Sequence, residues 1–579
     1  MSAFQSVYSR VAALGNRRLA LMAVVLIGVF AYFLRCLHLF DDAYYIVSPD
    51  SHYFNWMARL VQSGETQAYR FSVLPELQHS GITYPVAYLA RAMSSIFGMA
   101  PGDSLAFAGK FLPPLLALIS VIVIYFFVSR IYDRRVALFA TFTWAVLPNA
   151  VLIQGAGYLD RDGLSVTLVM MGAFIFYLSR DWHWQVRNVD LGWVWGCVLV
   201  LAIEALLYLE WLWLGPALLL AILGAFFAAR VLLGFYSRVA PAWDEPDVAE
   251  IVLGVARRTP ASFLRALRES PWKPLGLVLI ANVVATAVTP GYAALYDQVA
   301  DAFSEVTSGT AMELRGLTTG DIFSHWFVIV PLGVGVYVAA RRRGRADVFF
   351  LSWAACTFVL GLIARRMFLY ITPALAVVCG IGLAAVFDFK KSSPDTRTLR
   401  KAVGAILLVV MLFVGAMSGY GLAANPRVAA DSDWQDALAY LRDHTPQEAR
   451  VMCWWDYGYR VLDMAERTPV VDNGYHPKHV DNDIARVYCA TEDAEAVEIM
   501  QTYRADYVVF SEVEEKVLSS IAKMGMPERY EDPDGGPVEY EEWHMQDSLY
   551  RRAIDGVLPP GGRFDEVYRN DTVVILAPR

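Results

Sequence analysis

The chain alternates between long apolar runs and short polar segments over its first 424 residues. Each run is close to the roughly 20 residues that a helix needs to cross a bilayer core. Backbone polar groups in hydrocarbon must be satisfied within their own segment, so each run is expected to form a helix. The pattern predicts an α-helical polytopic membrane domain over residues 1–424. Its eleven runs span residues 20–37, 109–131, 135–156, 163–180, 191–209, 212–235, 274–291, 325–341, 347–365, 367–388 and 402–424.

Basic residues between the runs indicate the orientation of this domain. The first run follows Arg10, Arg17 and Arg18 and has no small-residue cleavage site close behind it, which predicts an uncleaved signal anchor with a cytoplasmic N-terminus. When sides alternate from there, each short cytoplasmic loop carries Arg or Lys, as the positive-inside rule requires. Segments 38–108 and 292–324, and everything after residue 424, then lie on the outer side.

The sequence after residue 424 is acidic, polar and rich in turn residues, which predicts a soluble domain over residues 425–579. Helical spacing of apolar residues covers 433–444. Short β-branched segments at 450–454, 468–471, 507–510 and 572–576 are typical of strands. The alternation of helix and strand indicates an α/β fold.

Composition supports a membrane protein and excludes two other classes. Apolar residues make up 56% of the chain and charged residues 18%. The net charge of -8 argues against a nucleic-acid-binding protein, which would need a basic face. Six cysteines in 579 residues exclude a disulfide scaffold. Only Cys453 and Cys489 lie in polar sequence, where they could pair if exported.

Four acidic residues fall on the outer side at positions close to the membrane: Asp50, Asp160, Asp162 and Glu313. Carboxylates gathered in one cleft would repel one another unless a cation lay among them. Oxygen ligands without cysteine or clustered histidine favour Mg²⁺ or Mn²⁺. The alternative for Asp160 and Asp162 is helix capping, because both precede a helix start, where the dipole favours negative charge.

The segment Trp454-Trp455-Asp456-Tyr457-Gly458 follows an expected strand. Adjacent residues of a strand point to opposite faces, so both tryptophans cannot fill one core. Indole N–H donors beside a carboxylate acceptor could bind a small hydroxyl group. The alternative is a half-buried aromatic end of a strand.

At these residues the chain resembles the catalytic subunit family of oligosaccharyltransferases, whose bacterial members are PglB-like enzymes of a single chain. Trp454–Gly458 matches the hallmark pentapeptide of the family, and the acidic motifs occur in the family's order. Arg366, in Arg-x-x-x-Tyr-x-x-Pro, looks like the arginine-bearing helix start of the family. The resemblance spans the whole chain and implies a GT-C fold with thirteen transmembrane helices.

The resemblance implies transfer of a glycan from a polyprenyl pyrophosphate to the asparagine of Asn-x-Ser/Thr, with inversion at the sugar. Asp50 and Glu313 would be catalytic and hydrogen-bond the acceptor amide. Mn²⁺ or Mg²⁺ would be held by Asp50, Asp160 and Glu313, with Asp162 as a ligand or behind the ligands.

The resemblance also implies the substrate contacts. Trp454, Trp455 and Asp456, with Thr310, would bind the acceptor sequon. Arg366, Tyr459 and His476 would bind the lipid pyrophosphate. The partners implied are lipid-linked oligosaccharide, acceptor proteins or peptides and membrane lipids, with no nucleic acid. The expected enzyme is a monomer in the bacterial inner membrane, with its C-terminal domain in the periplasm.

Two alternatives remain open from the sequence. Another polyprenyl-dependent GT-C glycosyltransferase would need the outer acids but not the hydroxyl-binding pair Trp454 and Trp455. A secondary transporter would use an intramembrane acid such as Glu204. However, no inverted repeat or pair of interrupted helices, common in transporters, is visible in the sequence.

Overall fold

The structure is a computed structural model. It describes residues 17–37, 49–63, 82–179, 181, 185–186, 189–190, 192–211, 214–239, 261–266, 274–280, 318–319, 324–388, 394–423, 429–472, 477–527 and 545–579. The chain divides into two compact units that are not continuous in sequence. The first unit comprises Met1–Leu37, Pro114–Gly155 and Arg161–Tyr420, and the second comprises His38–Pro113, Ala156–Asp160 and Gly421–Arg579.

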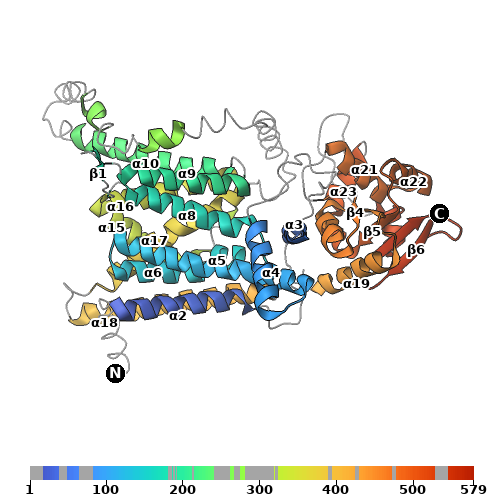
Figure 1. Cartoon of the computed structure of the whole chain (residues 1–579), viewed down its shortest axis with the longest axis horizontal. Helices are drawn as coiled ribbons and strands as arrows, with labels where there is room; N and C mark the ends of the chain where they lie inside the picture. The colour runs from blue at the N-terminus through green and yellow to red at the C-terminus, as the bar shows by residue number, and fades with distance from the viewer. Residues whose placement is uncertain are drawn as a thin grey trace. The chain divides into compact units, whose positions relative to one another are not determined.

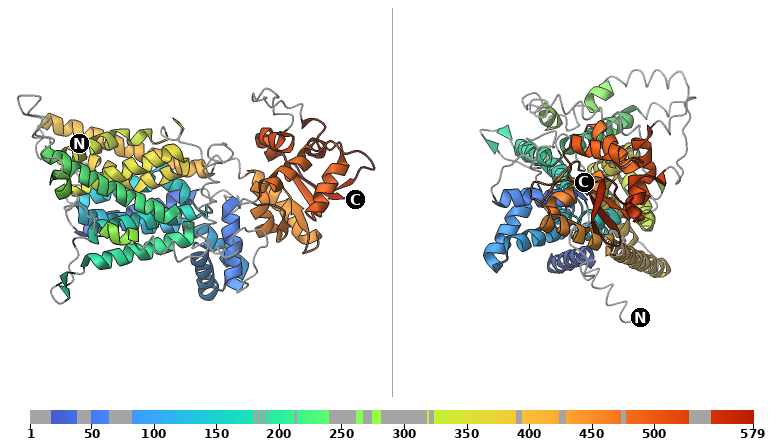
Figure 2. Two further views of the ribbon diagram at one scale, coloured as in Figure 1. Left: turned by 90° about the horizontal axis from the view of Figure 1, so that it is seen from above. Right: turned by 90° about the vertical axis from the view of Figure 1, so that its right-hand side faces the viewer.

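The first unit is a bundle of helices that run side by side (Figures 1 and 2). A two-stranded antiparallel ladder, β1 (Gln185–Val186) and β2 (Val189–Asp190), lies between two of them in sequence. The helices are α2 (Arg17–Arg35), the later part of α5 (Pro101–Ile131), α6 (Arg134–Val146), α7 (Pro148–Ile153), α8 (Arg161–Ser179), α9 (Gly192–Trp211), α10 (Leu214–Val239), the 3₁₀ helix η5 (Trp326–Val328), α15 (Ile329–Arg342), α16 (Arg345–Ile363), the 3₁₀ helix η6 (Arg365–Ile371), α17 (Thr372–Val386) and α18 (Pro394–Ala423).

Seven helices of the described residues are long and apolar enough to cross a membrane, which confirms the predicted polytopic helical domain. Three other apolar runs do not form one long helix within the described residues. Run 135–156 is divided at Leu147, because Pro148 has no backbone N–H to continue α6 and instead begins α7. Run 325–341 starts with a 3₁₀ turn, which leaves α15 with 14 residues. Run 274–291 is described only over 274–280, where it is helical.

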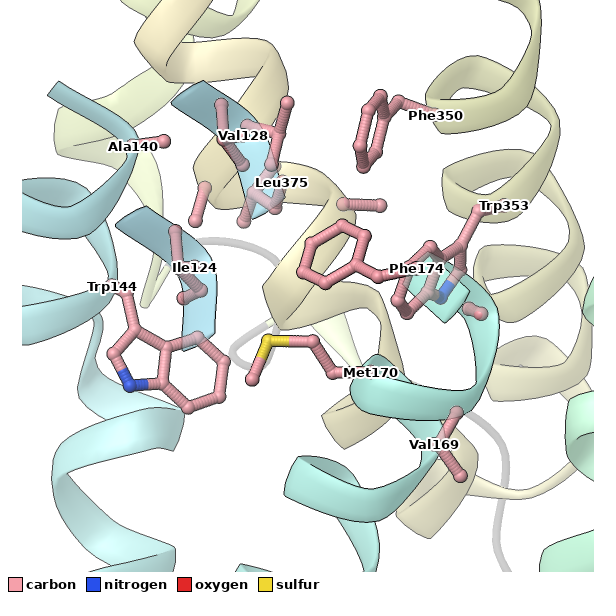
Figure 3. Packing of buried hydrophobic residues seen from close by; sticks show 14 of the residues in the cluster. Ile124, Val128, Ala140, Trp144, Val169, Met170, Phe174, Phe350, Trp353 and Leu375 are labelled. Carbon is pink, nitrogen blue, oxygen red and sulfur yellow. The ribbon is translucent and has the colours of Figure 1, made fainter. Parts of the chain in front are cut away.

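Small residues allow close packing inside this bundle. A Cβ on Gly335 of α15 would overlap the carbonyl oxygen of Val378, and a Cβ on Gly382 of α17 would overlap that of Pro331. Such residues let two membrane helices approach backbone to backbone. Elsewhere the core is aromatic: Figure 3 shows Phe174 of α8 directed toward Trp353 of α16, with ring centroids 6.1 Å apart.

The second unit begins with α3 (Pro49–Ser63), α4 (Thr83–Phe97) and the start of α5. Arg91 of α4 donates to the backbone carbonyls of Val61 (2.8 Å) and Gln62 (3.2 Å), which ties α4 to the C-terminal end of α3. The last residues of a helix leave their carbonyls without an intrahelical donor, and the guanidinium supplies one here.

The C-terminal part of the second unit is built on a mixed five-stranded sheet, in the order β4-β3-β5-β7-β6. Both β4 and β5 pair with β3 in parallel, and β7 is antiparallel to β5 and to β6. The register pairs Val451 with Tyr507 and Val509 with Ile575. The strands are β3 (Arg450–Met452), β4 (Thr468–Pro469), β5 (Tyr507–Ser511), β6 (Phe564–Arg569) and β7 (Val573–Pro578).

Helices pack around this sheet (Figure 2, orange to red), which confirms the α/β prediction. The buried faces of helices and strands form one hydrophobic cluster that includes Leu438, Ile484 and Val509. The helical elements are α19 (Ala429–His444), the 3₁₀ turn η7 (Trp455–Tyr457), α20 (Gly458–Arg460), the π-helical turn η8 (Val461–Ala465), α21 (Lys478–Cys489), α22 (Asp493–Thr502), the 3₁₀ turn η9 (Glu512–Val517), α23 (Leu518–Gly525) and α24 (Leu549–Ile554).

Cys453 and Cys489 are both buried and are not joined by a disulfide, so the pairing left open by the sequence does not form. Cys489 Sγ instead lies 3.8 Å from the carbonyl oxygen of Ile521, to which it can donate. Both side chains contribute to the core of the C-terminal sheet.

Candidate active site

The Trp454–Gly458 segment leaves the sheet directly after β3. The strand ends at Met452, so both tryptophans lie beyond it, and the expectation of a strand over 450–454 with its tryptophans on opposite faces is wrong. Trp454 has an extended backbone and is buried, whereas Trp455 begins η7 and is partly exposed. Their rings are nearly perpendicular, with an interplanar angle of 74°. The segment therefore keeps one indole in the core and leaves Trp455 and Asp456 partly exposed.

Tyr457 and Gly458 fix this segment against neighbouring elements. The Tyr457 ring stacks on Trp434 of α19 with centroids 4.1 Å apart. A Cβ on Gly458 would overlap the carbonyl oxygen of Val471 and crowd the Cα of Asp472. Glycine is required here because the backbone after β4 passes directly against it.

Behind Trp454, a buried polar network holds the backbone of the motif. The Tyr488 hydroxyl accepts from the Trp454 N–H (2.9 Å), donates to the Val509 carbonyl (2.8 Å) and lies 3.2 Å from Glu514 Oε1. The Ser511 N–H donates to Glu514 Oε2 at 2.7 Å. Burial raises the pKa of Glu514 to about 8, and the nearby Asp456 carboxylate adds to this shift. Glu514 is therefore largely protonated at neutral pH, which lowers the cost of burying it.

Helix α3 packs against the turn that follows this motif. His52 Nδ1 and Asp463 Oδ2 are 3.0 Å apart, and Asn55 Nδ2 donates to both Asp463 carboxylate oxygens at 3.2 and 3.3 Å. Arg59 forms an ion pair with Asp463 Oδ1 at 3.0 Å. Nearby, the rings of Tyr53 and Tyr459 are 4.7 Å apart. Asp50 is the second residue of this helix, so the predicted catalytic acid lies on a helix that contacts the turns directly after the Trp-Trp-Asp segment.

The loop that carries Asp160 lies close to α3, and both pack against α5 at Gly109. A Cβ on Gly109 would lie 3.3 Å from Asn55 Oδ1 and 3.5 Å from Leu159 Cδ2. The Gly157 N–H also donates to the Lys110 carbonyl at 3.0 Å. Asp160 itself is buried. Gly109 therefore lets α3 and the loop over 156–160 approach the same point on α5.

Asp162 and Arg366 meet in the first unit. Asp162 lies in the first turn of α8, and Arg366 Nε donates to its Oδ1 at 3.3 Å. The carboxylate is buried, and the guanidinium side chain is 14% exposed. Trp353 Nε1 donates to the Tyr370 carbonyl (3.0 Å), which fixes the 3₁₀ helix η6 that carries Arg366. Arg365 is more exposed than Arg366.

The donor chemistry of the predicted metal ligands fits a hard divalent cation. Asp160 and Asp162 are buried carboxylates close to a helix start, and they provide only oxygen donors. Within the described part of the chain, no group of three His, Cys, Asp or Glu side chains could hold a metal. Asp50 is described only in its backbone, and Thr310, Glu313 and His476 lie outside the described residues. The complete ligand set therefore stays a prediction.

Several residues that shape this site were not identified from the sequence: His52, Asn55, Arg59, Trp434, Asp463, Tyr488 and Glu514. The three polar residues of α3 follow a spacing of three and four, which places them on one helical face. A helical face made of such polar and charged side chains is typical of a solvated surface. The spacing was the available signal, but it does not identify the partner.

Two models of known protein families match the chain and together cover most of it. The model described as oligosaccharyl transferase STT3, N-terminal, matches residues 18–419, more than half of the chain. The model described as AglB core domain matches residues 445–514, which include the Trp454–Gly458 segment. The predicted resemblance to oligosaccharyltransferase catalytic subunits is confirmed.

Relatives and solved structures agree with this assignment. The rice protein named dolichyl-diphosphooligosaccharide–protein glycosyltransferase subunit STT3B is 22% identical, with 68% of this chain and 66% of that protein aligned. The Archaeoglobus fulgidus protein named dolichyl-phosphooligosaccharide-protein glycotransferase 1 is 23% identical over 85% of this chain and 87% of its own length. The similar Caenorhabditis elegans protein is matched over only 30% of its length.

The apo crystal structure of the Archaeoglobus fulgidus oligosaccharyltransferase has the same fold, with a TM-score of 0.65 at 17% identity over 96% of this chain and 80% of that one. The structure of that protein tethered to an acceptor peptide with the NVT sequon has a TM-score of 0.66 at 16% identity, with the same coverage. The relatives named here are archaeal and eukaryotic, so the PglB-like assignment stays a prediction. Together with the family match over residues 18–419, these findings show that the chain is a membrane protein that belongs to the STT3 family of oligosaccharyl transferases.

Proposed function

We propose that the chain is a glycosyltransferase that moves an oligosaccharide from a polyprenyl-pyrophosphate carrier to the asparagine of Asn-x-Ser/Thr. One observation carries the proposal: Trp455 and Asp456 are partly exposed on a segment fixed by Trp434, Tyr488 and Gly458, in a chain of this family. The Archaeoglobus fulgidus relative has been solved with an inhibitory peptide and a dolichol-phosphate, and also with an acceptor peptide, which supports both substrate classes.

The acceptor nitrogen needs activation, because the lone pair of an amide is delocalised. Rotation about a peptide C–N bond costs ~18–20 kcal/mol, which measures the strength of this conjugation. Asp50 and Glu313 would accept hydrogen bonds from the two amide N–H groups and turn the carboxamide out of conjugation. The amide nitrogen then attacks the anomeric carbon while the pyrophosphate departs, which inverts the sugar, and one amide proton would pass to a carboxylate that binds it.

Asp50, Asp160 and Glu313 would hold Mn²⁺ or Mg²⁺, with Asp162 behind them. The ion would supply a Lewis acid and would fix the acids that bind the amide. The Archaeoglobus fulgidus enzyme in complex with Zn and sulfate supports a divalent site in this family. The ion pair with Arg366 favours an orienting role for Asp162 over a ligand role, because its carboxylate is already engaged.

Trp455 and Asp456 would bind the Ser/Thr hydroxyl, which donates its proton to the carboxylate and accepts from an indole N–H. Trp454 would pack behind them, and Thr310 is the further candidate for sequon binding. A site built for a hydroxyl rejects residues that lack one, since its polar groups are then left unpaired.

Arg366 would neutralise the departing pyrophosphate, and a guanidinium suits this role because its N–H groups bind phosphate oxygens in pairs. Tyr459 and His476 are the further candidates for this contact. The chain would act as a monomer in the bacterial inner membrane, with a cytoplasmic N-terminus and a periplasmic C-terminal domain. Reporter fusions after residue 579 and at the N-terminus would test this orientation.

The test is transfer of lipid-linked oligosaccharide to two peptides that differ only in Asn-x-Thr and Asn-x-Ala, with and without chelator. We expect product only with threonine and only with Mn²⁺ or Mg²⁺ present. Asp50→Ala and Glu313→Ala should abolish turnover, whereas Trp455→Ala should chiefly raise the peptide KM. Equal product on both peptides would contradict sequon recognition and favour another polyprenyl-dependent glycosyltransferase.

A further inference from the structure

We propose that Asp463 is a positioning residue that anchors α3 and thereby fixes Asp50 relative to the Trp455-Asp456 segment. This inference rests on the proposed function, and it assigns a role to a buried carboxylate that contacts no expected substrate group. All residues of the argument belong to the second compact unit.

The Asp463 carboxylate contacts three side chains from one face of α3. His52, Asn55 and Arg59 are separated by three and four residues, so they lie in a row along α3. Each contacts the Asp463 carboxylate at 3.0–3.3 Å, and both of its oxygens are used.

The burial of this cluster distinguishes it from a surface ion pair. The side chains of Asp463 and His52 are 3% and 2% exposed. A buried carboxylate needs nearby donors, because an unsolvated charge is costly. These donors come from the first and middle parts of α3, so the helix cannot shift or rotate without breaking several contacts. Exposed pairs such as Arg59–Glu466 impose much less constraint.

The anchor lies close to both functional elements. Asp50 is two residues before His52 and within the first turn of the same helix. Asp463 follows Trp455 by eight residues through a continuous helical path of η7, α20 and η8. The rings of Tyr53 and Tyr459 are tilted by 34° with centroids 4.7 Å apart, and they form a second contact between α3 and this helical path. A displacement of about 1 Å in a reacting group can cost roughly 100-fold in rate, so such an anchor is expected to act on turnover.

The π-helical turn η8 positions the Asp463 carboxylate. Asp463 is the third residue of Val461–Ala465, and the turn ends at Glu466 with a left-handed backbone (φ 53°). Wide turns of this kind are rare and often lie at functional sites. Here the turn presents Asp463 to α3, while Nη2 of the Arg59 guanidinium also donates to the Asp463 backbone carbonyl at 3.2 Å.

The first test compares Asp463→Asn with Glu466→Gln in the full chain. Both changes remove one carboxylate partner of Arg59 and keep the side-chain size, but Glu466 is exposed and its carboxylate pairs with Arg59 Nη1 rather than with His52 or Asn55. For Asp463→Asn we expect kcat to fall about 10- to 100-fold with the peptide KM unchanged within about twofold. Glu466→Gln should stay near the wild-type rate. A change in KM alone, or equal effects of the two variants, would overturn the positioning role.

The second test does not depend on turnover. Hydrogen exchange of peptides from residues 49–63 should rise in Asp463→Asn and stay unchanged in Glu466→Gln. Unchanged exchange in both variants would refute the anchor even if the wild-type enzyme transfers glycan. If the wild-type chain transfers no glycan while exchange rises as expected, the proposed function fails and the anchor itself stands.

A mutant cycle with Arg59→Ala checks that Asp463 acts through α3. If the two residues share one contact, the double variant with Asp463→Asn should be no more than about twofold slower than Asp463→Asn alone. Multiplied losses would show that Asp463 acts independently of this helix and would contradict the proposal.

Discussion

Arg366 and Asp162 lie 204 positions apart in sequence and form an ion pair, with Nε 3.3 Å from Oδ1. The guanidinium is held at the start of α8 by a carboxylate that is itself buried. A fixed guanidinium needs little reorganisation when a charged leaving group arrives, which favours a role in stabilising that charge.

This pair predicts different effects for two neighbouring arginines. Arg366→Ala should lower kcat for glycan transfer by about 100-fold or more, because a lost charge-stabilising donor typically costs that much. The more exposed Arg365→Ala should stay within about threefold of wild type. Steady-state transfer rates at saturating peptide would measure both, and equal losses would remove the special role of Arg366.

Gly458→Ala should destabilise the C-terminal sheet domain. The added methyl group would meet the backbone at Val471 and Asp472, which cannot move aside as a flexible side chain could. Overpacking of this kind typically costs about 1–3 kcal/mol. Thermal unfolding followed by tryptophan fluorescence would measure it. Gly102→Ala is the matched control, because among the described residues beyond its own helical turn no atom lies within 4 Å of its added Cβ.

The buried Glu514 side chain should make the stability of the C-terminal sheet domain depend on pH. Burial raises its pKa to about 8 from an ordinary value of 4.5. Between these values the folded state binds more protons than the unfolded state, so the free energy of unfolding should fall as pH rises from about 5 to 8. Glu514→Gln keeps the shape without the titration and should flatten this slope. Melting curves at pH 5, 6.5 and 8 would show it; parallel slopes for the two proteins would contradict the buried protonated state.

The chain carries a sequon of its own at Asn570-Asp571-Thr572. Asn570 Nδ2 donates to the Asp433 carbonyl (2.8 Å) and to the Tyr568 hydroxyl (3.1 Å), and the Thr572 hydroxyl donates to Asp433 Oδ2 (2.8 Å). The amide and hydroxyl that a transferase must bind are thus engaged in the folded domain. Intact-mass measurement should find Asn570 unmodified. Asp433→Ala, which frees the Thr572 hydroxyl, is the variant in which modification would first appear.

Much of the fold could be predicted from local patterns. Apolar runs located helices of the first unit, and β-branched segments located four of the five strands of the C-terminal sheet. The edge strand β6 was missed because Asp565 and Glu566 interrupt its apolar pattern, and an edge strand tolerates such exposure. Pro148 indicates the break between α6 and α7, but hydropathy alone predicts one continuous helix there.

The site was less predictable. The acids were identified because carboxylates close to a membrane are energetically costly. The Trp454–Gly458 motif was identified because two adjacent tryptophans beside a carboxylate are unusual. The contact between His52 and Asp463 could not be predicted, since the residues are 411 positions apart and each resembles an ordinary surface polar group. Local sequence indicates that α3 has a polar face, but only the tertiary structure shows that a carboxylate covers it.

The long sequence separation between His52 and Asp463 has a consequence for biogenesis. A ribosome adds about 5–20 residues each second, so α3 is synthesised roughly 20–80 s before its carboxylate partner. During that interval the polar face of the nascent helix lacks its native partner and is open to chaperones and proteases. Truncation before residue 463 should therefore yield a polypeptide that inserts into the bilayer yet is cleared rapidly by quality control.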